Sequence, residues 1–263
     1  MDFGLNQRVA LVTGASSGLG LAIARALAAE GCAVAMVARR RELLEREARG
    51  IIADSKGRAL PLVADVTRPE EVAHVTSQAA ALLGPIDILV ANAGGPPSTT
   101  FATTTDEQLQ AALELNLLSS IRMTRAVVPG MRERRWGRVI FVSSMAAKQP
   151  LGGLLLSNTA RAGLLGFAKT IANECAPDNV LVNTVLPGHF DTDRATELAK
   201  MRSAREGRPF EEILRSRASS IPIGRSGRPE EFAAAVAFLA SERASFITGV
   251  ALQIDGGQIA GLI

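Results

Sequence analysis

A glycine-rich stretch near the N-terminus, TGASSGLG from Thr13 to Gly20, has the residue types that bind a phosphate group. It follows an apolar run and precedes a run with helical periodicity, so we expect it to join a strand to a helix. Glycine lets the backbone approach a phosphate closely, and the start of a helix favours an anion. Such a stretch can also be only a turn, but this order of elements is the one that nucleotide sites use. It predicts a nucleotide site formed by Gly14, Ser16, Ser17, Gly18, Leu19 and Gly20.

Three arginines, residues 39–41, follow the second expected strand at residues 33–38. NAD-binding sites commonly have an acidic residue here, which binds the ribose hydroxyls and would repel a 2′-phosphate. A guanidinium can instead pair with that phosphate through two hydrogen bonds. Arg39 is the first candidate and Arg40 the second, whereas Arg41 is assigned to a solvated helix start. The alternative is that all three only keep the strand end soluble. The pattern predicts NADP(H) in preference to NAD(H).

Apolar strand-sized runs alternate with helical patterns along the whole chain. Such alternation predicts an α/β fold, a Rossmann-type doubly wound parallel sheet of about seven strands with helices on both faces. We find no linker or repeat and expect one domain over residues 1–263, with a charged, mobile substrate lid at about 193–220. Strands are expected at residues 8–14, 33–38, 58–66, 86–94, 138–144, 180–188 and 250–255, and the main helices at 20–31, 106–131, 154–175 and 229–240.

Composition excludes several other classes of protein. The net charge is only +3 and aromatic residues make up 4% of the chain, so we expect no nucleic-acid partner. No apolar run is long enough for a membrane span, and the first residues lack the pattern of a secretory signal. Cys32 and Cys175 lie far apart in apolar surroundings, which indicates free core thiols in a reducing compartment. We therefore expect a cytoplasmic protein with no membrane partner and no metal.

Further motifs follow in order along nearly the whole chain, and together they resemble the short-chain dehydrogenase/reductase family. They are Gly-x-x-x-Gly-x-Gly after Thr13, ANAG, Asn116 in ELNLLSS, VSS, PGHFDT, GRSGRPEE and DGG. By length and late motifs the chain is most similar to the beta-ketoacyl-acyl-carrier-protein reductases. Ser17, which is often basic in NADP enzymes of this family, gives no support to that cofactor. The resemblance implies further cofactor contacts from Asp65, Val66, Asn92, Ala93, Gly94, Arg161, Pro187, Gly188 and Thr192.

The catalytic set that this resemblance implies is Asn, Ser, Tyr and Lys, and here it is incomplete. Asn116 and Ser144 match, but Ser157 and Arg161 stand where the family has Tyr and Lys, and the chain contains no tyrosine. The Tyr gives a proton to the carbonyl oxygen, whereas an alcohol is far less acidic and ends roughly 4 Å short, about one water's width. Arg161 can bind the ribose but will not act as an acid. We expect catalysis to involve Asn116, Ser144, Ser157 and Arg161.

Three interpretations follow from this set. The preferred one is an NADP(H)-dependent oxidoreductase that transfers hydride between nicotinamide and a carbonyl or alcohol. In it, a water oriented by Ser144, Ser157 and Asn116 replaces the phenol, because correct placement is itself a large share of catalysis. In the second, His189 supplies the proton, although a loop histidine pointing to solvent is favoured over that role. In the third, the chain binds nucleotide and catalyses nothing, and serves as a sensor, scaffold or subunit.

The substrate is expected to be a small molecule or an acyl thioester, with a beta-ketoacyl group as one option. Arginines in the predicted lid could attract an anionic carrier or only keep a helix soluble. The resemblance also implies a homo-oligomer, a dimer or a tetramer, that pairs through the helices expected at 106–131 and 154–175.

Overall fold

The computed structural model describes residues 2–55 and 57–262, so Met1 and Ile263, the ends of the predicted domain, lie outside the described residues. Its centre is a parallel sheet with the strand order β3-β2-β1-β4-β5-β6-β7. The predicted α/β doubly wound sheet of about seven strands is confirmed. The strand order reverses between β1 and β4, and their carboxyl ends open a crevice of the kind that binds ligands. The strands are β1 Val9–Thr13, β2 Ala33–Ala38, β3 Arg58–Val63, β4 Ile88–Ala91, β5 Gly137–Val142, β6 Val180–Pro187 and β7 Ala251–Ile254.

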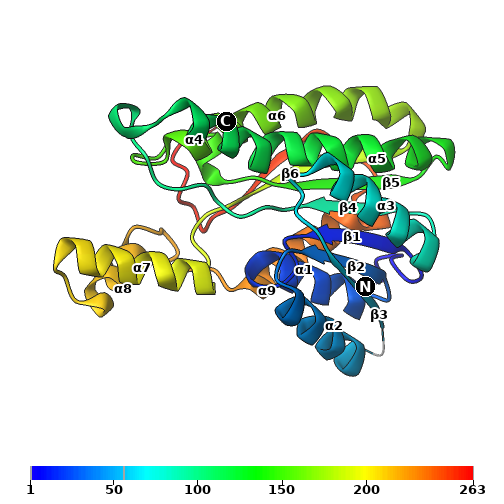
Figure 1. Cartoon of the computed structure of the whole chain (residues 1–263), viewed down its shortest axis with the longest axis horizontal. Helices are drawn as coiled ribbons and strands as arrows, with labels where there is room; N and C mark the ends of the chain where they lie inside the picture. The colour runs from blue at the N-terminus through cyan, green and yellow to red at the C-terminus, as the bar shows by residue number, and fades with distance from the viewer. Residues whose placement is uncertain (1, 56, 263) are drawn as a thin grey trace.

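The central strands are buried on both faces, which is why they are apolar without a break. In β1 the side chains of Ala10 and Val12 face one layer of helices, while those of Val9 and Leu11 face the other. This is the two-residue alternation of a strand. Helices α1, α2 and α9 pack on the first face and α3, α5 and α6 on the second, and Figure 1 shows the sheet between them. The helices are α1 Gly18–Ala29, α2 Arg41–Ser55, α3 Pro69–Leu83, α4 Asp106–Leu113, α5 Ser119–Glu133, α6 Leu155–Cys175, α7 Asp193–Glu206, α8 Phe210–Ser219 and α9 Pro229–Ala240.

Several strands end earlier than the sequence predicts, because their pairing with the neighbouring strand stops. The strand expected at 86–94 pairs with β5 only as far as Ala91, after which the backbone of Asn92 bonds to the side chain of Thr13. The strand expected at 58–66 ends at Val63, where its pairing with β2 stops. Residues beyond these points are free to face a ligand instead of a neighbouring strand.

The long helix expected at 106–131 is interrupted. A π-helical turn, Glu114–Leu118, separates α4 from α5 and carries Asn116 at its centre. Such turns are rare and frequently mark functional sites.

The region predicted as a lid folds as two helices, α7 and α8, joined at Gly207, whose φ of 63° is left-handed. Figure 1 shows both helices set to one side of the sheet, and the lid function itself stays a prediction.

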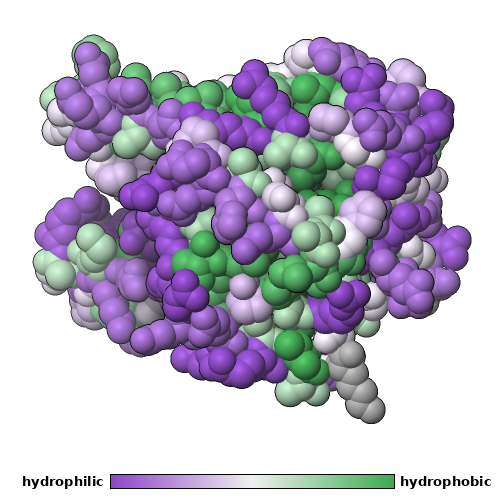
Figure 2. Space-filling model, turned by 45° about the vertical axis from the view of Figure 1, so that its right-hand side comes forward, coloured by the Kyte–Doolittle hydropathy of each residue, from purple (hydrophilic) through white to green (hydrophobic). Residues whose placement is uncertain are grey.

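The surface drawn in Figure 2 is dominated by hydrophilic side chains, with hydrophobic patches between them. In the part of the chain that the structure describes, no helix combines the length and apolar character that crossing a membrane requires. Across residues 2–55 and 57–262, no group of three or more His, Cys, Asp or Glu side chains is placed to hold a metal ion. Cys32 and Cys175 are free and buried, as predicted, and burial raises the pKa of the Cys32 thiol to about 12.

Candidate active site

The glycine-rich turn between β1 and α1 has the shape of a phosphate cradle. Gly14 and Gly18 have φ values of 62° and 57°, which favour glycine. A Cβ on Gly20 would collide with the carbonyl oxygen of Gly14, so only glycine lets the turn close this tightly. Ser17 lies at the N-cap of α1 without capping it through its side chain. The unbonded N–H groups of the first helical turn can therefore face an anion.

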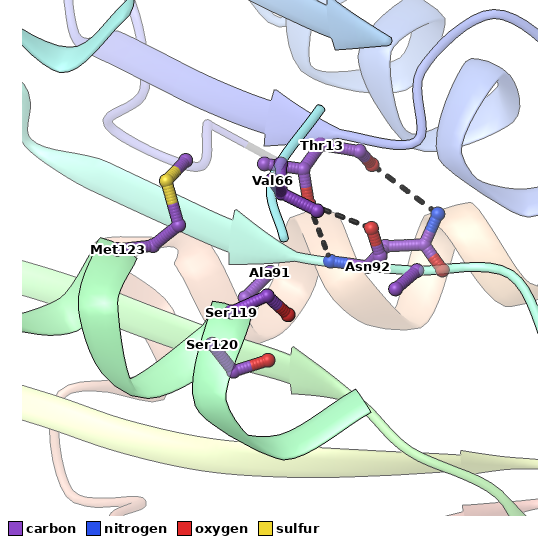
Figure 3. A pocket seen from close by; sticks show the side chains of 8 residues that line it. Thr13, Val66, Ala91, Asn92, Ser119, Ser120 and Met123 are labelled. Atoms are coloured by element: carbon purple, nitrogen blue, oxygen red, sulfur yellow. Dashed lines mark hydrogen bonds between the residues drawn. The ribbon is translucent and has the colours of Figure 1, made fainter. Parts of the chain in front are cut away.

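Thr13 and Asn92 join the carboxyl ends of β1 and β4, where the strand order reverses. The Thr13 hydroxyl donates to the carbonyl oxygen of Asn92 at 2.6 Å and accepts from its backbone N–H at 2.8 Å. The Asn92 side-chain amide donates to the carbonyl oxygen of Thr13 at 3.2 Å. Figure 3 shows these bonds beside a small hollow. Asn92, expected as a cofactor contact, thus uses its amide to hold the two strand ends together. The hollow is lined by Thr13, Val66, Ala91, Asn92, Ala93, Ser119, Ser120 and Met123.

The two candidate arginines after β2 lie in different places. The guanidinium of Arg40 donates to the hydroxyl of Ser17 at 2.6 Å and to that of Ser16 at 3.2 Å. It therefore lies directly on the glycine-rich turn. The side chain of Arg39 is 74% exposed, and its closest charged partner is Asp65 at 3.9 Å. Arg40 therefore contacts the turn and Arg39 does not, and which of them binds a 2′-phosphate stays a prediction.

Asp65 lies just beyond the end of β3. Its carboxylate accepts hydrogen bonds from the Thr67 backbone N–H at 3.0 Å and from the Thr67 hydroxyl at 2.8 Å. Burial alone would raise the pKa of Asp65, but these bonds and the nearby Arg39 and Arg68 outweigh it and lower the pKa. Asp65 is therefore charged at neutral pH beside the hollow that Val66 lines.

Ser144 lies two residues beyond β5, at the same edge of the sheet. It is the N-cap of a short 3-10 turn, Met145–Ala147, and its hydroxyl oxygen accepts from the Ala146 N–H at 3.1 Å. That bond fixes the oxygen while leaving the hydroxyl proton free to donate. Half-buried at the carboxyl end of a central strand, Ser144 is placed to contact a substrate oxygen.

Arg161 and Ser157 lie one turn apart on the buried side of α6. The Arg161 guanidinium donates to the carbonyl oxygens of Val142 at 3.0 Å and Ser143 at 2.7 Å, and weakly to that of Ala93 at 3.4 Å. Among the described residues it has no carboxylate partner. Burial lowers the pKa of Arg161 to about 10, so the side chain stays charged at neutral pH.

Asn116 and Arg161 donate hydrogen bonds to adjacent carbonyl groups in the loop after β4. Its amide donates to the Gly94 carbonyl oxygen at 2.9 Å, while Arg161 bonds to that of Ala93. Asn116 is 2% exposed, and within the described part of the chain its Oδ1 atom has no hydrogen-bond partner. A buried acceptor without a donor is costly, which indicates that a water or ligand donates to it.

The loop after β6, residues 188–192, reaches the glycine-rich turn at Thr192. A Cβ on Gly18 would be 3.5 Å from the Thr192 methyl group, and a Cβ on Gly188 would collide with the Gln258 side chain. Thr192 also begins α7, because its hydroxyl accepts from the Ala195 N–H at 3.2 Å. Thr192 is thus near the turn, and the predicted contacts of Pro187, Gly188 and Thr192 with the cofactor stay predictions.

His189 differs from its expected orientation. The sequence favours a loop histidine that points to solvent, but the ring is half-buried and its Nδ1 atom contacts the side-chain amide of Gln258. Burial, then the positive charge of Arg217, lower the pKa of His189 against an opposing effect of the Gln258 bond. The solvent-facing interpretation is wrong.

Sequence reasoning misses Gln258 and the anchoring of Arg40 by two serines. Gln258 follows the DGG motif at a spacing that gives no hint of a contact 69 residues back in the chain. In the sequence, Ser17 is notable as an uncharged residue at a place that is often basic in NADP enzymes of the family. A hydroxyl at residue 17 together with an arginine after the second strand is the signal that could have predicted this contact.

The comparisons with known proteins agree with this geometry. A family model described as Enoyl-(Acyl carrier protein) reductase matches residues 14–258. The chain is 37% identical to 3-oxoacyl-(acyl-carrier-protein) reductase FabG of Escherichia coli (strain K12) over 250 residues, which cover 95% of this chain and 96% of the relative. The chain therefore belongs to the short-chain dehydrogenase/reductase family.

Solved structures show the same similarity over the whole molecule. L-sorbose reductase from Gluconobacter frateurii, complexed with NADPH and L-sorbose, matches with a TM-score of 0.96 at 38% identity, covering 100% of both chains. A variant of actinorhodin polyketide ketoreductase with NADPH matches with a TM-score of 0.91 at 34% identity, covering 95% of this chain and 97% of the other.

Proposed function

We propose that this protein is an NADPH-dependent reductase of carbonyl compounds, with a small molecule or an acyl thioester as substrate. The observation that carries the proposal is the meeting of two features at one edge of the sheet. One is the glycine-rich turn with Arg40 held on Ser16 and Ser17. The other is the polar wall formed by Asn116, Ser144 and Arg161. Relatives that reduce carbonyl groups and neighbours complexed with NADPH support it.

The residues present fit a dinucleotide. Only glycine fits at position 20, the first turn of α1 can face a phosphate, and Arg40 adds a cation that suits a 2′-phosphate. Thr192, on the loop after β6, lies against the glycine-rich turn near Gly18. The cofactor would supply the hydride, while this chain holds the cofactor, positions the carbonyl and arranges the proton.

A water is our proposed proton donor, because the chain has no tyrosine to serve as one. The free Oδ1 atom of Asn116 can accept from such a water. The hydroxyl groups of Ser144 and Ser157 can orient it, since one lies at the end of β5 and the other on the buried side of α6. Water is a weaker acid than a phenol with a lowered pKa, so we expect slower turnover than with a tyrosine at this place.

Arg161 supports this reaction through its charge. Its guanidinium is fixed by carbonyl groups at the ends of β4 and β5 and is protonated at neutral pH. A buried, fixed cation stabilises negative charge that develops on a nearby carbonyl oxygen more strongly than an exposed one does. The resemblance also implies that residue 161 contacts the ribose of the cofactor.

A protein that binds the nucleotide without catalysis is the competing proposal, and the absence of tyrosine favours it. Both proposals require the same cofactor site, so only turnover separates them. The deciding experiment titrates NADPH into the protein and then follows its oxidation with beta-ketoacyl thioesters, ketones and quinones. We expect binding and slow oxidation with at least one class. Binding without turnover on every substrate would reject the reductase proposal.

Self-association is also part of the proposal. The strand β7 forms one edge of the sheet, and Val250, Leu252 and Phe246 beside it are exposed apolar side chains. Open edges with apolar residues tend to pair with another chain. Together with the helices α5 and α6, this edge supports the dimer or tetramer implied by the resemblance.

A further inference from the structure

His189 is held by Gln258 through three contacts. The His189 backbone N–H donates to Oε1 of Gln258 at 2.9 Å, and the ring nitrogen Nδ1 lies 2.7 Å from Nε2 and 3.1 Å from Oε1 of the same amide. The next residue, Phe190, is buried and packs edge-on against Phe232, with ring centroids 5.3 Å apart. His189 itself lies in a bend just beyond the end of β6 and is half-buried.

The shorter of the two ring contacts favours one position for the proton on the His189 ring. Oε1 of Gln258 already accepts from the backbone, and the shorter ring contact is to the amide Nε2, which can only donate. Nδ1 is then the acceptor, and the neutral ring has its proton on Nε2. The lowered pKa of His189 agrees with a neutral ring at pH 7. His189 therefore has one N–H donor, Nε2, that the contacts with Gln258 do not use.

The C-terminal segment places this donor beside the proposed substrate site. Gln258 contacts His189, and two residues later the Ala260 N–H donates to Oε1 of Gln149 at 3.1 Å. Two residues span at most about 7 Å, so one short C-terminal segment contacts both the loop that carries His189 and the residue Gln149. Gln149 follows the 3-10 turn that begins at Ser144, and the strands β5 and β6 that precede Ser144 and His189 are neighbours.

We propose that Nε2 of His189 donates a hydrogen bond to a substrate oxygen beside the reacting carbonyl, and that Gln258 is the positioning residue that orients it. The site then selects carbonyl compounds that carry a second acceptor oxygen nearby, such as 3-oxo thioesters or hydroxyketones, over plain ketones. This proposal rests on the reductase function proposed above.

Binding to the NADP⁺ complex tests it, because no reduction occurs in that form. Calorimetry compares an acetoacetyl thioester with a monoketone of the same length. His189→Phe keeps the ring size and removes the donor, and it should weaken the thioester roughly threefold to tenfold, as loss of one hydrogen bond predicts. The monoketone should be unaffected. Gln258→Leu should give the same selective loss, whereas His189→Gln, which keeps an N–H at similar reach, should restore binding.

His74→Ala is the matched control, because His74 is the other histidine and lies exposed on α3. Equal weakening of both ligands, or no change with His189→Phe, would overturn the proposal, and NADP⁺ affinity confirms that each variant is folded. Steady-state rates on the same proteins separate the two proposals. Selective binding without NADPH oxidation refutes the reductase function alone, and oxidation without selectivity refutes the role of His189 alone.

Discussion

Arg40 gives the glycine-rich turn a positive charge that its own residues lack. Its guanidinium bridges Ser16 and Ser17, so the side chain is already ordered where a 2′-phosphate would arrive. An ordered donor loses less conformational entropy on binding than a free one. We therefore expect residue 40, on the neighbouring strand end, to contribute to the preference for NADPH, with the two serines as its support.

Arg40→Ala should weaken NADPH binding roughly tenfold to a hundredfold, because charged hydrogen bonds to the 2′-phosphate are lost. NADH, which lacks that phosphate, should bind nearly as before. Fluorescence titration with both cofactors measures the ratio. Arg39→Ala is the matched variant and should change NADPH affinity less, and the opposite ranking would show that Arg39 holds the phosphate.

Ser157→Tyr combined with Arg161→Lys should raise kcat roughly a hundredfold if a water now replaces the phenol, because general acid catalysis typically gives that gain or more. The new phenol would fill the water's place, and the lysine would lower its pKa. NADPH oxidation with the best substrate measures the effect.

Arg161→Lys alone is the control, since it loses the bonds to Val142 and Ser143 without supplying an acid. It should lower stability and leave kcat no higher. If the double variant binds NADPH yet turns over at the original rate, the substrate carbonyl does not lie beside Ser157.

At the scale of elements, the start of α9 is held by Glu231. Its carboxylate accepts from Arg225 at 2.7 Å and 2.8 Å and from the Arg228 backbone N–H at 2.8 Å. Hydrogen bonds from Arg225, then from Arg228, lower the pKa of Glu231 to about 2. Because the folded pKa lies below the ordinary value, the stabilisation is present above about pH 4.5 and is lost as the pH falls toward 2.

Glu231→Gln should therefore lower Tm slightly at pH 7, and the difference from the unchanged protein should shrink between about pH 4.5 and about pH 3. The group is exposed, so the effect is small and screened by salt. Thermal melts across this pH range measure it. A difference that is constant with pH would show that the charge of Glu231 plays no part.

Over the whole molecule, the predicted binding residues and a group of stabilising contacts lie at opposite ends of the strands. The carboxyl ends of the strands carry the turn, Ser144 and His189. Near the other end, the guanidinium groups of Arg8 and Arg138 lie 3.6 Å and 4.4 Å from the ring centroid of Trp136, whose N–H donates to Glu242. Cation–π contacts of this kind stabilise the fold.

Local patterns predicted much of this molecule. Alternating apolar runs and glycine spacing are local properties, so the parallel sheet, the glycine-rich turn between β1 and α1 and the helix that carries Ser157 and Arg161 follow from the residues themselves. Local patterns do not predict whether the side chains of Arg39 and Arg40 are exposed or ordered, because this depends on which serine each guanidinium can reach.

Three features could come only from the tertiary structure. They are the Oδ1 atom of Asn116 without a donor in the described part of the chain, the carbonyl oxygens that bind the guanidinium of Arg161, and the contact of His189 with Gln258. Each joins segments that lie far apart in the chain and meet only after the sheet has formed. The sequence by itself determined which chemical groups the site contains. The packing of the strand ends and the C-terminal segment decided which of these groups are free to act, because hydrogen bonds within the fold occupy the other groups.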